Sequence, residues 1–328
     1  MHTDGGIILT EPFFLKPYFQ PKIWGGRKLE TFGYDLPEGK IGECWAISAH
    51  PHGPATIENG PLAGKTLAEA YSDNPEYFGN PSSKVFPLLT KILDAEDALS
   101  VQVHPDDEYA AIHEHELGKT ECWYVINADP GSYLIYGHHA QTHEELVSMI
   151  ENGQWDKLLR KVPVKAGDFF YVPSGTIHAL TKGIMVLETQ QSSDTTYRLY
   201  DYDRTDDAGN KRELHLKQSE DVTIVPHVDP KLDITTEKIG DSTITTFVTA
   251  PTSPFFSVYR WQVNGELKLT KSADYTLISV LDGDGTITAD DKTFALTKGT
   301  HLLVPSQIAS WTINGKLDII ASTPGKEA

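Results

Sequence analysis

Two segments of the chain repeat one another, and this repetition restricts the architectures open to the sequence more than any other feature. Residues 165–178 and 297–310 each contain a Gly-centred turn, a strand-like apolar run and the tripeptide Val-Pro-Ser. Each segment is preceded by a hairpin-like stretch, at residues 121–135 and 275–287. Two copies of one β-module explain this pattern better than a single continuous domain.

The two copies differ at positions where a chemical function would lie. Residues common to both copies are expected to form the scaffold, so the residues found only in the first copy become candidates for function. The aligned pairs are Gly131 with Gly285, which are shared, and Glu121 with Tyr275 and His178 with Ser310, which differ.

Short apolar runs separated by Gly, Pro, Asn and Asp dominate the chain, which is typical of antiparallel sandwiches and barrels. Helical patterns are few and short. A connector near residues 225–230 divides the chain into residues 1–230 and residues 231–328. The expected strands are 86–93, 99–104, 121–126, 168–172, 184–190, 197–202, 255–263, 275–281, 285–289, 301–305 and 317–322, and the expected helices are 66–71, 106–117 and 144–151, with an extension over 155–162.

One predicted strand, residues 99–104, has an unusual polar face. Alternation along a strand places Leu99, Val101 and Val103 on one face, towards a core. The opposite face then carries a hydroxyl, an amide and an imidazole in a row, from Ser100, Gln102 and His104. A solvent-facing strand more often carries Lys, Glu or Thr at such positions, so this face is a candidate for a site.

A metal centre is the chemistry that this face favours. Gln102, His104, Glu121 and His178 offer imidazole nitrogens and side-chain oxygens, which zinc accepts in catalytic sites. The strands of a small barrel bring such inward-facing residues together. Two His and one carboxylate also suit Fe(II), so the residues alone leave the metal open. Gln102 is either a fourth ligand or a hydrogen-bonding neighbour of the ligands.

Cationic side chains near these positions indicate an anionic substrate. Lys119 lies two residues before Glu121, so both share a strand face. Lys91 lies inside an apolar run, where a charge requires a partner or a polar cavity. Asp194 and Arg198 also share a face, and a carboxylate can orient a guanidinium whose other donors then bind phosphate. With the hydroxyl of Ser100, this set suits a phosphorylated polyol.

Charge and composition restrict the partners. The net charge of −18 argues against nucleic acid and acidic membrane surfaces. The sequence contains no apolar run long enough to span a bilayer, and residues 1–6 lack the basic start of a signal peptide. Cys44 and Cys122 are too few for a disulfide framework and are expected to be buried. We therefore expect a cytoplasmic protein that acts on a small molecule. The sequence leaves open whether it is a monomer or a homodimer.

At the level of motifs, the chain resembles the type I mannose-6-phosphate isomerase family, in its compact bacterial form. The resemblance covers essentially the whole sequence, and the first motif below is the most specific. The motifs that carry it are residues 99–106, 118–121, 175–179, 15–26 and 42–48.

This resemblance implies two cupin-type jelly-roll barrels, with zinc in the first. It implies an N-terminal catalytic cupin, residues 1–230, and a C-terminal cupin without metal ligands, residues 231–328. The reaction it implies interconverts mannose 6-phosphate and fructose 6-phosphate through a cis-enediol. The site residues it implies are Gln102, His104, Glu121 and His178 for the metal, Lys91 and Ser100 for substrate, and Arg198, Lys119 and Asp194 for catalysis.

Three matters stay open at the level of the sequence. The group that removes the carbon-bound proton is Glu43, Glu188 or a metal-bound water. A cupin-type Fe(II) oxygenase uses the same ligand types, although an apolar substrate requires no cationic cluster. A non-catalytic sugar-phosphate binding protein would show tight binding without turnover.

Overall fold

The computed structural model describes residues 11–328, so residues 1–6, on which the expectation about a signal peptide depends, lie outside it. Antiparallel strands make up most of the regular secondary structure of the described chain and the helices are short, which confirms the mainly-β fold class. No helix among these residues is long and apolar enough to cross a membrane.

The chain divides into two compact units. The C-terminal unit contains Ala46–Leu88, Leu232–Ala328 and the described part of the segment that ends at Tyr18. The central unit contains Phe19–Trp45 and Leu89–Lys231. The boundary predicted between residues 230 and 231 lies next to Lys231, after which the chain passes from the central unit to the C-terminal unit. The chain also passes between the units after Tyr18, Trp45 and Leu88.

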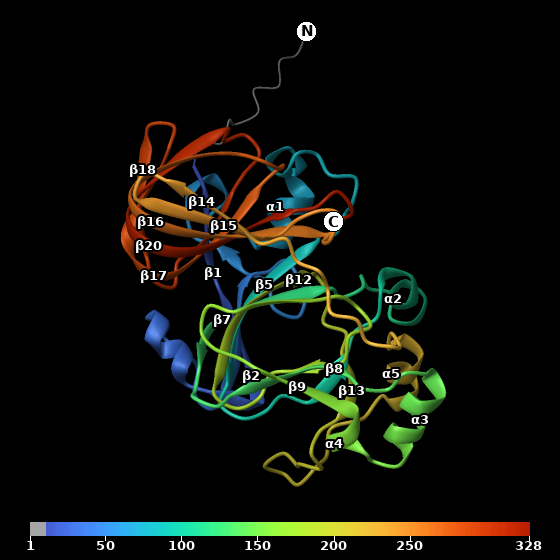
Figure 1. Ribbon diagram of the computed structural model, residues 1–328. Coiled ribbons are helices and arrows are strands. Elements are labelled where there is room, and N and C mark those ends of the chain that lie inside the picture. The colour runs from blue at the N-terminus through green and yellow to red at the C-terminus, as the bar shows by residue number, and fades with distance from the viewer. Residues whose placement is uncertain (1–10) are drawn as a thin grey trace. The chain divides into compact units, whose positions relative to one another are not determined.

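The C-terminal unit is built on one nine-stranded sheet (Figure 1). Its core is formed mainly by side chains of the three longest strands, among them Trp261, Ile287 and Ile313. The strands, in sheet order, are β14 (Thr235–Ile239), β15 (Ser242–Val248), β16 (Phe256–Thr270), β20 (Ser310–Pro324), β17 (Thr276–Ala289), β19 (His301–Val304), β1 (Phe13–Lys16) and β4 (Thr56–Ile57), with β18 (Lys292–Thr297) paired to β17.

The two strands expected at residues 275–281 and 285–289 are one continuous strand, β17, with an irregularity between Val280 and Asp282. The same unit contains α1 (Leu67–Asp73), which begins at a capping box formed by Thr66 and Glu69. It also contains the short 3₁₀ helices η2 (Gly60–Leu62) and η3 (Pro75–Phe78).

The central unit packs two sheets around a shared apolar core. Trp24, Leu93 and Trp123 come from the six-stranded sheet, and Leu134 and Tyr136 come from the five-stranded sheet. The first sheet runs in the order β10 (Phe169–Val172), β7 (Glu121–Ala128), β12 (Ile184–Gln191), β5 (Leu88–Ala95), β2 (Tyr18–Gly26) and β3 (Ile41–Ile47), and the second in the order β13 (Tyr197–Tyr200), β6 (Val101–Val103), β11 (His178–Ala179), β8 (Tyr133–His138) and β9 (Leu159–Pro163).

The helices of the central unit cover the five-stranded sheet, where Val101 and Val103 pack with Leu146 and Ile150 (Figure 1). The helix expected over residues 155–162 is wrong beyond its first turn. Leu159 and the residues after it pair with β8, and alternating burial along this stretch is the period of a strand. The helices are α2 (Asp107–His113), α3 (His143–Glu151), α4 (Trp155–Leu158) and α5 (Leu216–Val222), with η1 (Lys28–Phe32) elsewhere in the unit.

The predicted faces of the 99–104 segment need one correction. Val101 and Val103 are fully buried in the core beneath the helices, as expected. Leu99 instead packs in the core between the two sheets, because the strand begins only at Val101 and the chain before it does not alternate.

The repeat is confirmed at the level of backbone hydrogen bonds. Gly167 and Gly299 have φ of +90° and +89°, a conformation that glycine adopts at no steric cost. Gly167 N–H donates to the carbonyl of Val125 (2.8 Å), and Gly299 N–H donates to that of Val280 (2.9 Å). The N–H of Val125 donates to the carbonyl of Asp168, and the N–H of Val280 donates to the carbonyl of Thr300, both at 2.9 Å.

This equivalence shifts the predicted alignment of the preceding strands by one residue. Val172 pairs with Glu121, and its counterpart Val304 pairs with Thr276. The counterpart of Glu121 is therefore Thr276 and not Tyr275, and a slip of one residue places the side chain on the other face of the strand.

The predicted alignment of Gly131 with Gly285 is also wrong. Gly131 lies in a turn with φ of +84°, whereas Gly285 lies inside β17, paired with Leu296 and Gly315.

Candidate metal centre and substrate pocket

Three of the predicted metal ligands meet in the interior of the central unit. His104 follows β6, Glu121 begins β7 and His178 begins β11, and all three are buried. One potential ligand atom from each lies within 4.8 Å of those of the other two. Nε2 of His104 is 3.4 Å from Oε2 of Glu121, and Nε2 of His178 is 3.1 Å from Oε1.

The polar atoms of this cluster fit a shared cation better than a hydrogen-bonded network. Both carboxylate oxygens of Glu121, both ring nitrogens of His104 and Nε2 of His178 are buried without a hydrogen-bond partner. Buried polar atoms normally have partners. Nδ1 of His178 lies 2.8 Å from the carbonyl of Thr176, and a proton shared there leaves Nε2 as a lone-pair donor towards Glu121.

The protonation states of the cluster also suit ligation. Burial, together with the charge of Lys119, lowers the pKa of His104 to about 3, so its imidazole is neutral. Burial opposes ionisation of Glu121, but the facing imidazoles of His178 and His104 hold the pKa of this carboxyl well below its usual range. Neutral imidazoles and a carboxylate are the forms that bind metal.

Gln102 lies directly opposite His178 in the pairing of β6 with β11. Residues directly opposite in a sheet project from the same face, so the amide lies on the side of the metal cluster. Gln102 is partly exposed and also lines the neighbouring pocket. Its direct ligation of a metal stays a prediction.

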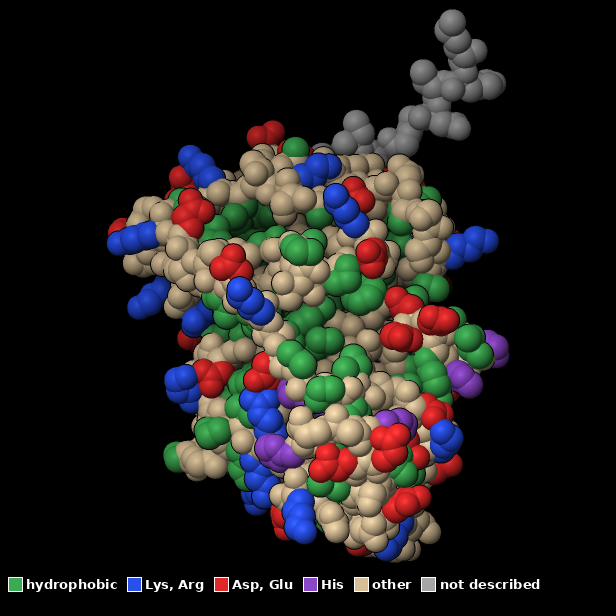
Figure 2. Space-filling view, turned by 45° about the vertical axis from the view of Figure 1, so that its right-hand side comes forward, with side chains coloured by type: hydrophobic (Ala, Val, Ile, Leu, Met, Phe, Trp, Pro, Cys, Tyr) green, Lys and Arg blue, Asp and Glu red, His purple; other side chains and the backbone are tan. Residues whose placement is uncertain are grey.

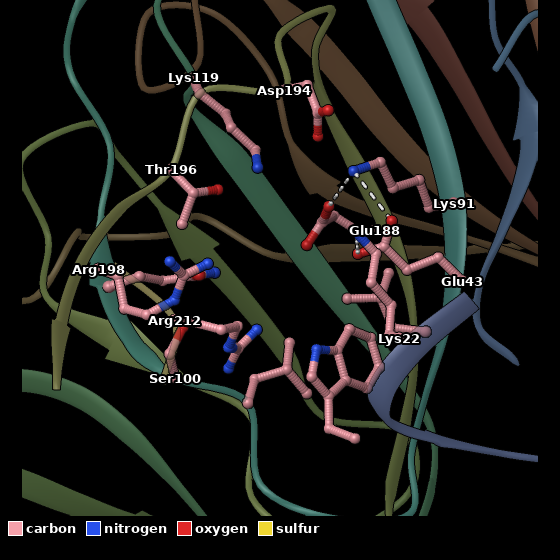
Figure 3. A pocket seen from close by; sticks show the side chains of 14 residues that line it. Lys22, Glu43, Lys91, Ser100, Lys119, Glu188, Asp194, Thr196, Arg198 and Arg212 are labelled. Carbon is pink, nitrogen blue, oxygen red and sulfur yellow. Dashed lines mark ion pairs between the residues drawn. The ribbon is translucent and has the colours of Figure 1, made fainter. Parts of the chain in front are cut away.

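A polar pocket contains every predicted substrate and catalytic residue (Figure 3). Five further polar residues line it. Of these, Glu43 and Glu188 are the two protein groups proposed as bases from the sequence, whereas Lys22, Thr196 and Arg212 were missed. Among the lining residues are Lys91, Ser100, Gln102, Lys119, Asp194 and Arg198 from the prediction, and Lys22, Glu43, Glu188, Thr196 and Arg212 beside them.

The cations of this pocket matter because the protein as a whole carries a strongly negative charge, which disfavours an anionic ligand. The chain has a net charge of −18. On the face shown in Figure 2, Lys and Arg side chains are mixed with Asp and Glu over most of the surface, with several Lys and Arg at the lower left. An anionic ligand must therefore find its counter-charge locally.

At one side of the pocket, Lys91 lies between two carboxylates (Figure 3). Its Nζ is 3.7 Å from Glu43 and 3.9 Å from Glu188. Each carboxylate also accepts a hydrogen bond from a buried indole, Glu43 from Trp45 (2.6 Å) and Glu188 from Trp123 (2.8 Å). The predicted requirement for a partner of Lys91 is thus met by two acids.

These three groups differ in charge state. Burial alone would lower the pKa of Lys91, but Glu43 and Glu188 raise it, so the ammonium stays charged. Burial would raise the pKa of Glu43, but Lys91 and Lys22 hold it below its usual range. Burial and the charge of Glu121 raise the pKa of Glu188 to about 7. Glu188 is therefore the carboxyl of this pair that titrates near neutrality.

Arg198 lies at the other side of the pocket. Its guanidinium donates to the carbonyl of Glu213 (2.8 Å), its backbone N–H donates to His215 (3.1 Å), and its Nε is buried without a partner. Asp194 also lines the pocket. Figure 3 shows Asp194 on the side of Lys91, whose pKa its charge helps to raise, and not beside Arg198, so the expected orientation of Arg198 by Asp194 finds no support in this arrangement.

Arg212 is the most informative residue that the sequence reasoning missed. It lies in the irregular segment between β13 and α5, lines the pocket and forms an ion pair with the buried Asp201 (2.6 Å). The only signal in the sequence is a pair of basic residues, Lys211 and Arg212, at the end of a segment rich in Asp.

Antiparallel sheets that enclose a buried His–Glu–His cluster, beside a pocket rich in cations, define a class: metal-binding β-proteins with a site for a small anionic molecule. Comparison with known proteins narrows this class. Residues 13–141 match the family model "Phosphomannose isomerase type I, catalytic domain", and residues 243–324 match "Mannose-6-phosphate isomerase, cupin domain".

Curated relatives match over nearly the full length. The chain is 56% identical over 315 residues to mannose-6-phosphate isomerase of Streptococcus mutans, and the aligned region covers 96% of this chain and 98% of that protein. It is 50% identical over 316 residues to mannose-6-phosphate isomerase ManA of Bacillus subtilis, and the aligned region covers 96% of this chain and 99% of that protein.

Solved structures agree. The mannose 6-phosphate isomerase of Bacillus subtilis superposes with a TM-score of 0.92 at 50% identity, covering 95% of this chain and 99% of that chain. A putative mannosephosphate isomerase of Archaeoglobus fulgidus, 20% identical, superposes with a TM-score of 0.75 over 98% of this chain and all of that chain, which shows a shared fold. The chain belongs to the type I phosphomannose isomerase family.

Proposed function

We propose that this protein is an aldose–ketose isomerase that interconverts D-mannose 6-phosphate and D-fructose 6-phosphate through a cis-enediol. The observation that carries the proposal is the buried cluster of His104, Glu121 and His178 next to a pocket lined by cations and two indole-bound carboxylates. The relatives named for this reaction support the choice of substrate.

The cluster suits a zinc ion held by His104, Glu121 and His178, with Gln102 as the fourth ligand. When bound, zinc would polarise the substrate carbonyl and orient the O1/O2 edge of the sugar. The neutral imidazole of His104, the ionised carboxylate of Glu121 and the unpartnered buried polar atoms are the support for a resident cation.

The reaction moves a proton between C1 and C2 of the sugar, so it requires a base that titrates near neutral pH. We assign this role to Glu188, because its raised pKa of about 7 suits a group that takes and returns a proton. Glu43 is held ionised by Lys91 and Lys22, which makes it a poor proton shuttle and a good anchor for Lys91.

The remaining charged residues stabilise and orient the sugar. Arg198 stabilises the negative charge that develops on the enediolate oxygens, Asp194 supports the charge of Lys91, and Lys119 lines the sugar beside the metal cluster. Lys91 and Ser100 bind substrate from opposite sides of the pocket (Figure 3).

The architecture and setting follow the family. The proposed fold is two jelly-roll cupin barrels, with the catalytic cupin within residues 1–230 and a cupin without metal ligands within residues 231–328, as a monomer or homodimer. Two free, buried cysteines, Cys44 and Cys122, accord with a reducing compartment, and we propose the cytoplasm.

A coupled assay for conversion of mannose 6-phosphate tests the function. Activity should be lost on chelation and restored by zinc. No isomerisation by the zinc-loaded protein would overturn the proposal. Oxygen uptake with added Fe(II) would favour the oxygenase, and tight binding of the sugar phosphate without turnover would favour a binding protein.

A further inference from the structure

The C-terminal unit contains a cavity of its own, of about 580 Å³, which the proposed function does not use. The residues that line it come from segments 71–87 and 249–328, and all of them belong to this unit. Sites for small molecules usually measure from about 300 to about 1,000 Å³. The cavity is therefore large enough for a molecule the size of a sugar with one or two rings.

The cavity lies on strands that are equivalent to those of the substrate pocket. The six-stranded sheet of the central unit runs β10, β7, β12, β5, β2, β3, and the C-terminal sheet contains β19, β17, β20, β16, β15, β14 in the same spatial order. This order makes β16 the counterpart of β5 and β20 the counterpart of β12. Lys91 and Glu188 line the substrate pocket from β5 and β12, and Tyr259 and Thr323 line the cavity from β16 and β20. The second copy therefore has a hollow at the corresponding strands, with different side chains in it.

The charge of this cavity differs from that of the substrate pocket. Five Lys and Arg side chains line the substrate pocket (Figure 3), whereas the charged side chains among the described residues that line the cavity are one base, Lys326, and one acid, Asp274. Nearly half of the residues that line the cavity carry a hydroxyl, among them Ser253, Ser257 and Ser272. A phosphorylated ligand would find no cluster of counter-charge there, and a neutral ligand with many hydroxyls would find partners.

Two of these hydroxyls lack the partner that a buried group normally has. Oγ of Ser253 and the phenol oxygen of Tyr275 are buried without a hydrogen-bond partner, on residues that are 1% and 3% exposed. Both residues line the cavity. Since buried polar atoms normally have partners, and since a hydroxyl can donate one hydrogen bond and accept others, a bound polyol would satisfy both groups.

Aromatic rings supply the apolar part of the lining. Tyr71, Phe78, Tyr259 and Tyr275 line the cavity. Phe78 packs edge-on against Tyr71 and Tyr275, with ring centroids 5.0 Å and 5.7 Å apart, so these rings hold one another in place. A tyrosine offers an apolar ring and a polar tip, which suits a sugar, because a sugar presents C–H groups on its faces and hydroxyls at its edge.

The wall formed by residues 71–87 is fixed by contacts within the protein. The hydroxyl of Tyr71 donates to the carbonyl of Ser83 (3.2 Å), and Oγ of Ser83 donates to the carbonyl of Val85 (3.0 Å) and accepts from its N–H (3.1 Å). Gly79 has φ of +80° and lies so close to Asp274 that a side chain would have no room there. A preformed wall lowers the entropic cost of binding.

We propose that this cavity is a binding site for a neutral, unphosphorylated sugar of one or two rings. Ser253, Ser257 and Tyr275 are its hydrogen-bonding groups, and Tyr259 is the ring on which the sugar lies. The inference stands apart from the proposed function, since none of these residues lines the substrate pocket.

Calorimetric titration of the zinc-loaded protein with D-mannose and with maltose tests the site. The substrate pocket is kept saturated by an equilibrated mixture of mannose 6-phosphate and fructose 6-phosphate, so that the neutral sugars do not enter it. We expect at least one of the two sugars to bind with a Kd on the order of 1 mM. Raising the sugar phosphates further should leave this Kd unchanged, because the cavity has no cluster of cations.

Two substitutions locate the binding in the cavity. Ser257→Leu removes a hydroxyl and adds bulk, and Tyr259→Leu removes the ring, so each should weaken binding by at least about 10-fold. Tyr259 also packs against the core of the unit, so Ser257→Leu carries the test if Tyr259→Leu does not fold. The matched control is Ser310→Leu, an exposed position on β20 outside the cavity, which should bind the sugar as the wild type does. All three variants should keep the isomerase kcat/KM of the wild type.

Three results would overturn the site. They are the absence of binding of both sugars, by calorimetry and by saturation-transfer NMR, the same affinity in Ser257→Leu as in the wild type, and displacement of the neutral sugar by excess sugar phosphate. A protein that binds the sugar in this way but does not isomerise mannose 6-phosphate would uphold the cavity and overturn the proposed function.

Discussion

The turn at Gly167 in the central unit and the turn at Gly299 in the C-terminal unit close with the same backbone hydrogen bonds, and the strands around them pair in the same register. The side chains on that shared backbone are different. Where the first copy has Glu121 and His178, the second has hydroxyl residues. The counterparts are Thr276 for Glu121, Ser310 for His178 and, by the pairing of β12 and β20 with their neighbours, Ala321 for Glu188.

The second copy contains a buried imidazole of its own, yet it lacks a comparable cluster. His301 is 1% exposed, and its Nδ1 lies 2.9 Å from Oγ of Ser279. In the part of the chain that the structure describes, the group of His, Cys, Asp and Glu side chains close enough to share a metal is His104, Glu121 and His178. A buried His on this scaffold therefore needs a facing carboxylate before it can contribute to a metal site.

The largest expected effect is the difference in zinc content and activity between a substitution of His104 and the same substitution of His301. His104→Asn should remove most bound zinc and lower isomerase activity by at least about 10³-fold, because a metal that stabilises charge in the transition state contributes several kcal/mol. The same substitution at His301 should leave both unchanged. Metal analysis and the coupled assay measure the difference. Full zinc content in His104→Asn would refute its role as a ligand.

The next effect concerns Glu188, whose counterpart is Ala321. Glu188→Gln should lower kcat by about 10²- to 10⁴-fold, the usual contribution of a general base. Because the base must lose its proton, kcat/KM of the wild type should fall as the pH drops through the raised pKa of Glu188, about 7. Glu43→Gln should retain that acid limb. A pH–rate profile unchanged by Glu188→Gln would assign the base elsewhere.

A smaller effect is expected on the stability of the C-terminal unit. Burial lowers the pKa of His301 from 6.5 to about 3, so between these values the unfolded state binds a proton that the folded state does not. The free energy of unfolding should therefore fall with decreasing pH below about 6.5, by up to about 1.4 kcal/mol per pH unit from this group. Denaturant titrations of His301→Gln across this range should show a shallower slope. Equal slopes would place a proton on His301 in the folded state.

The smallest effect tests whether the two scaffolds are equivalent. Gly167→Ala and Gly299→Ala each force a side chain into a left-handed conformation, which should cost about 1–2 kcal/mol. Thermal unfolding measures both. We expect losses of similar size, with kcat unaffected in Gly167→Ala. A loss at one position alone would show that the repeated turn supports only one of the units.

The sequence predicted the repeat and the main site residues because both depend on local pattern. Turn glycines, Val-Pro-Ser and alternating strands can be read along the chain, and the motifs place Lys91, Ser100 and His104 at a common site. The alignment of Glu121 was wrong by one residue, since register depends on hydrogen bonds between strands. Arg212 was missed because an irregular loop has no period, and its position depends on an ion pair with Asp201.

The way in which the C-terminal unit is assembled has a consequence for the growing polypeptide. Strand β1 is made at the start of synthesis, but its partner β19 is almost the last strand to be made. During translation, β1 and the aromatic residues of 46–88 that pack around Tyr275 therefore wait for the final hundred or so residues. The central unit contains its own strand partners and can fold earlier. A ribosome stalled near residue 231 would hold a finished pocket and a β1 that can pair with β4 but whose edge towards β19 is still open, and such an edge is a binding target for a chaperone.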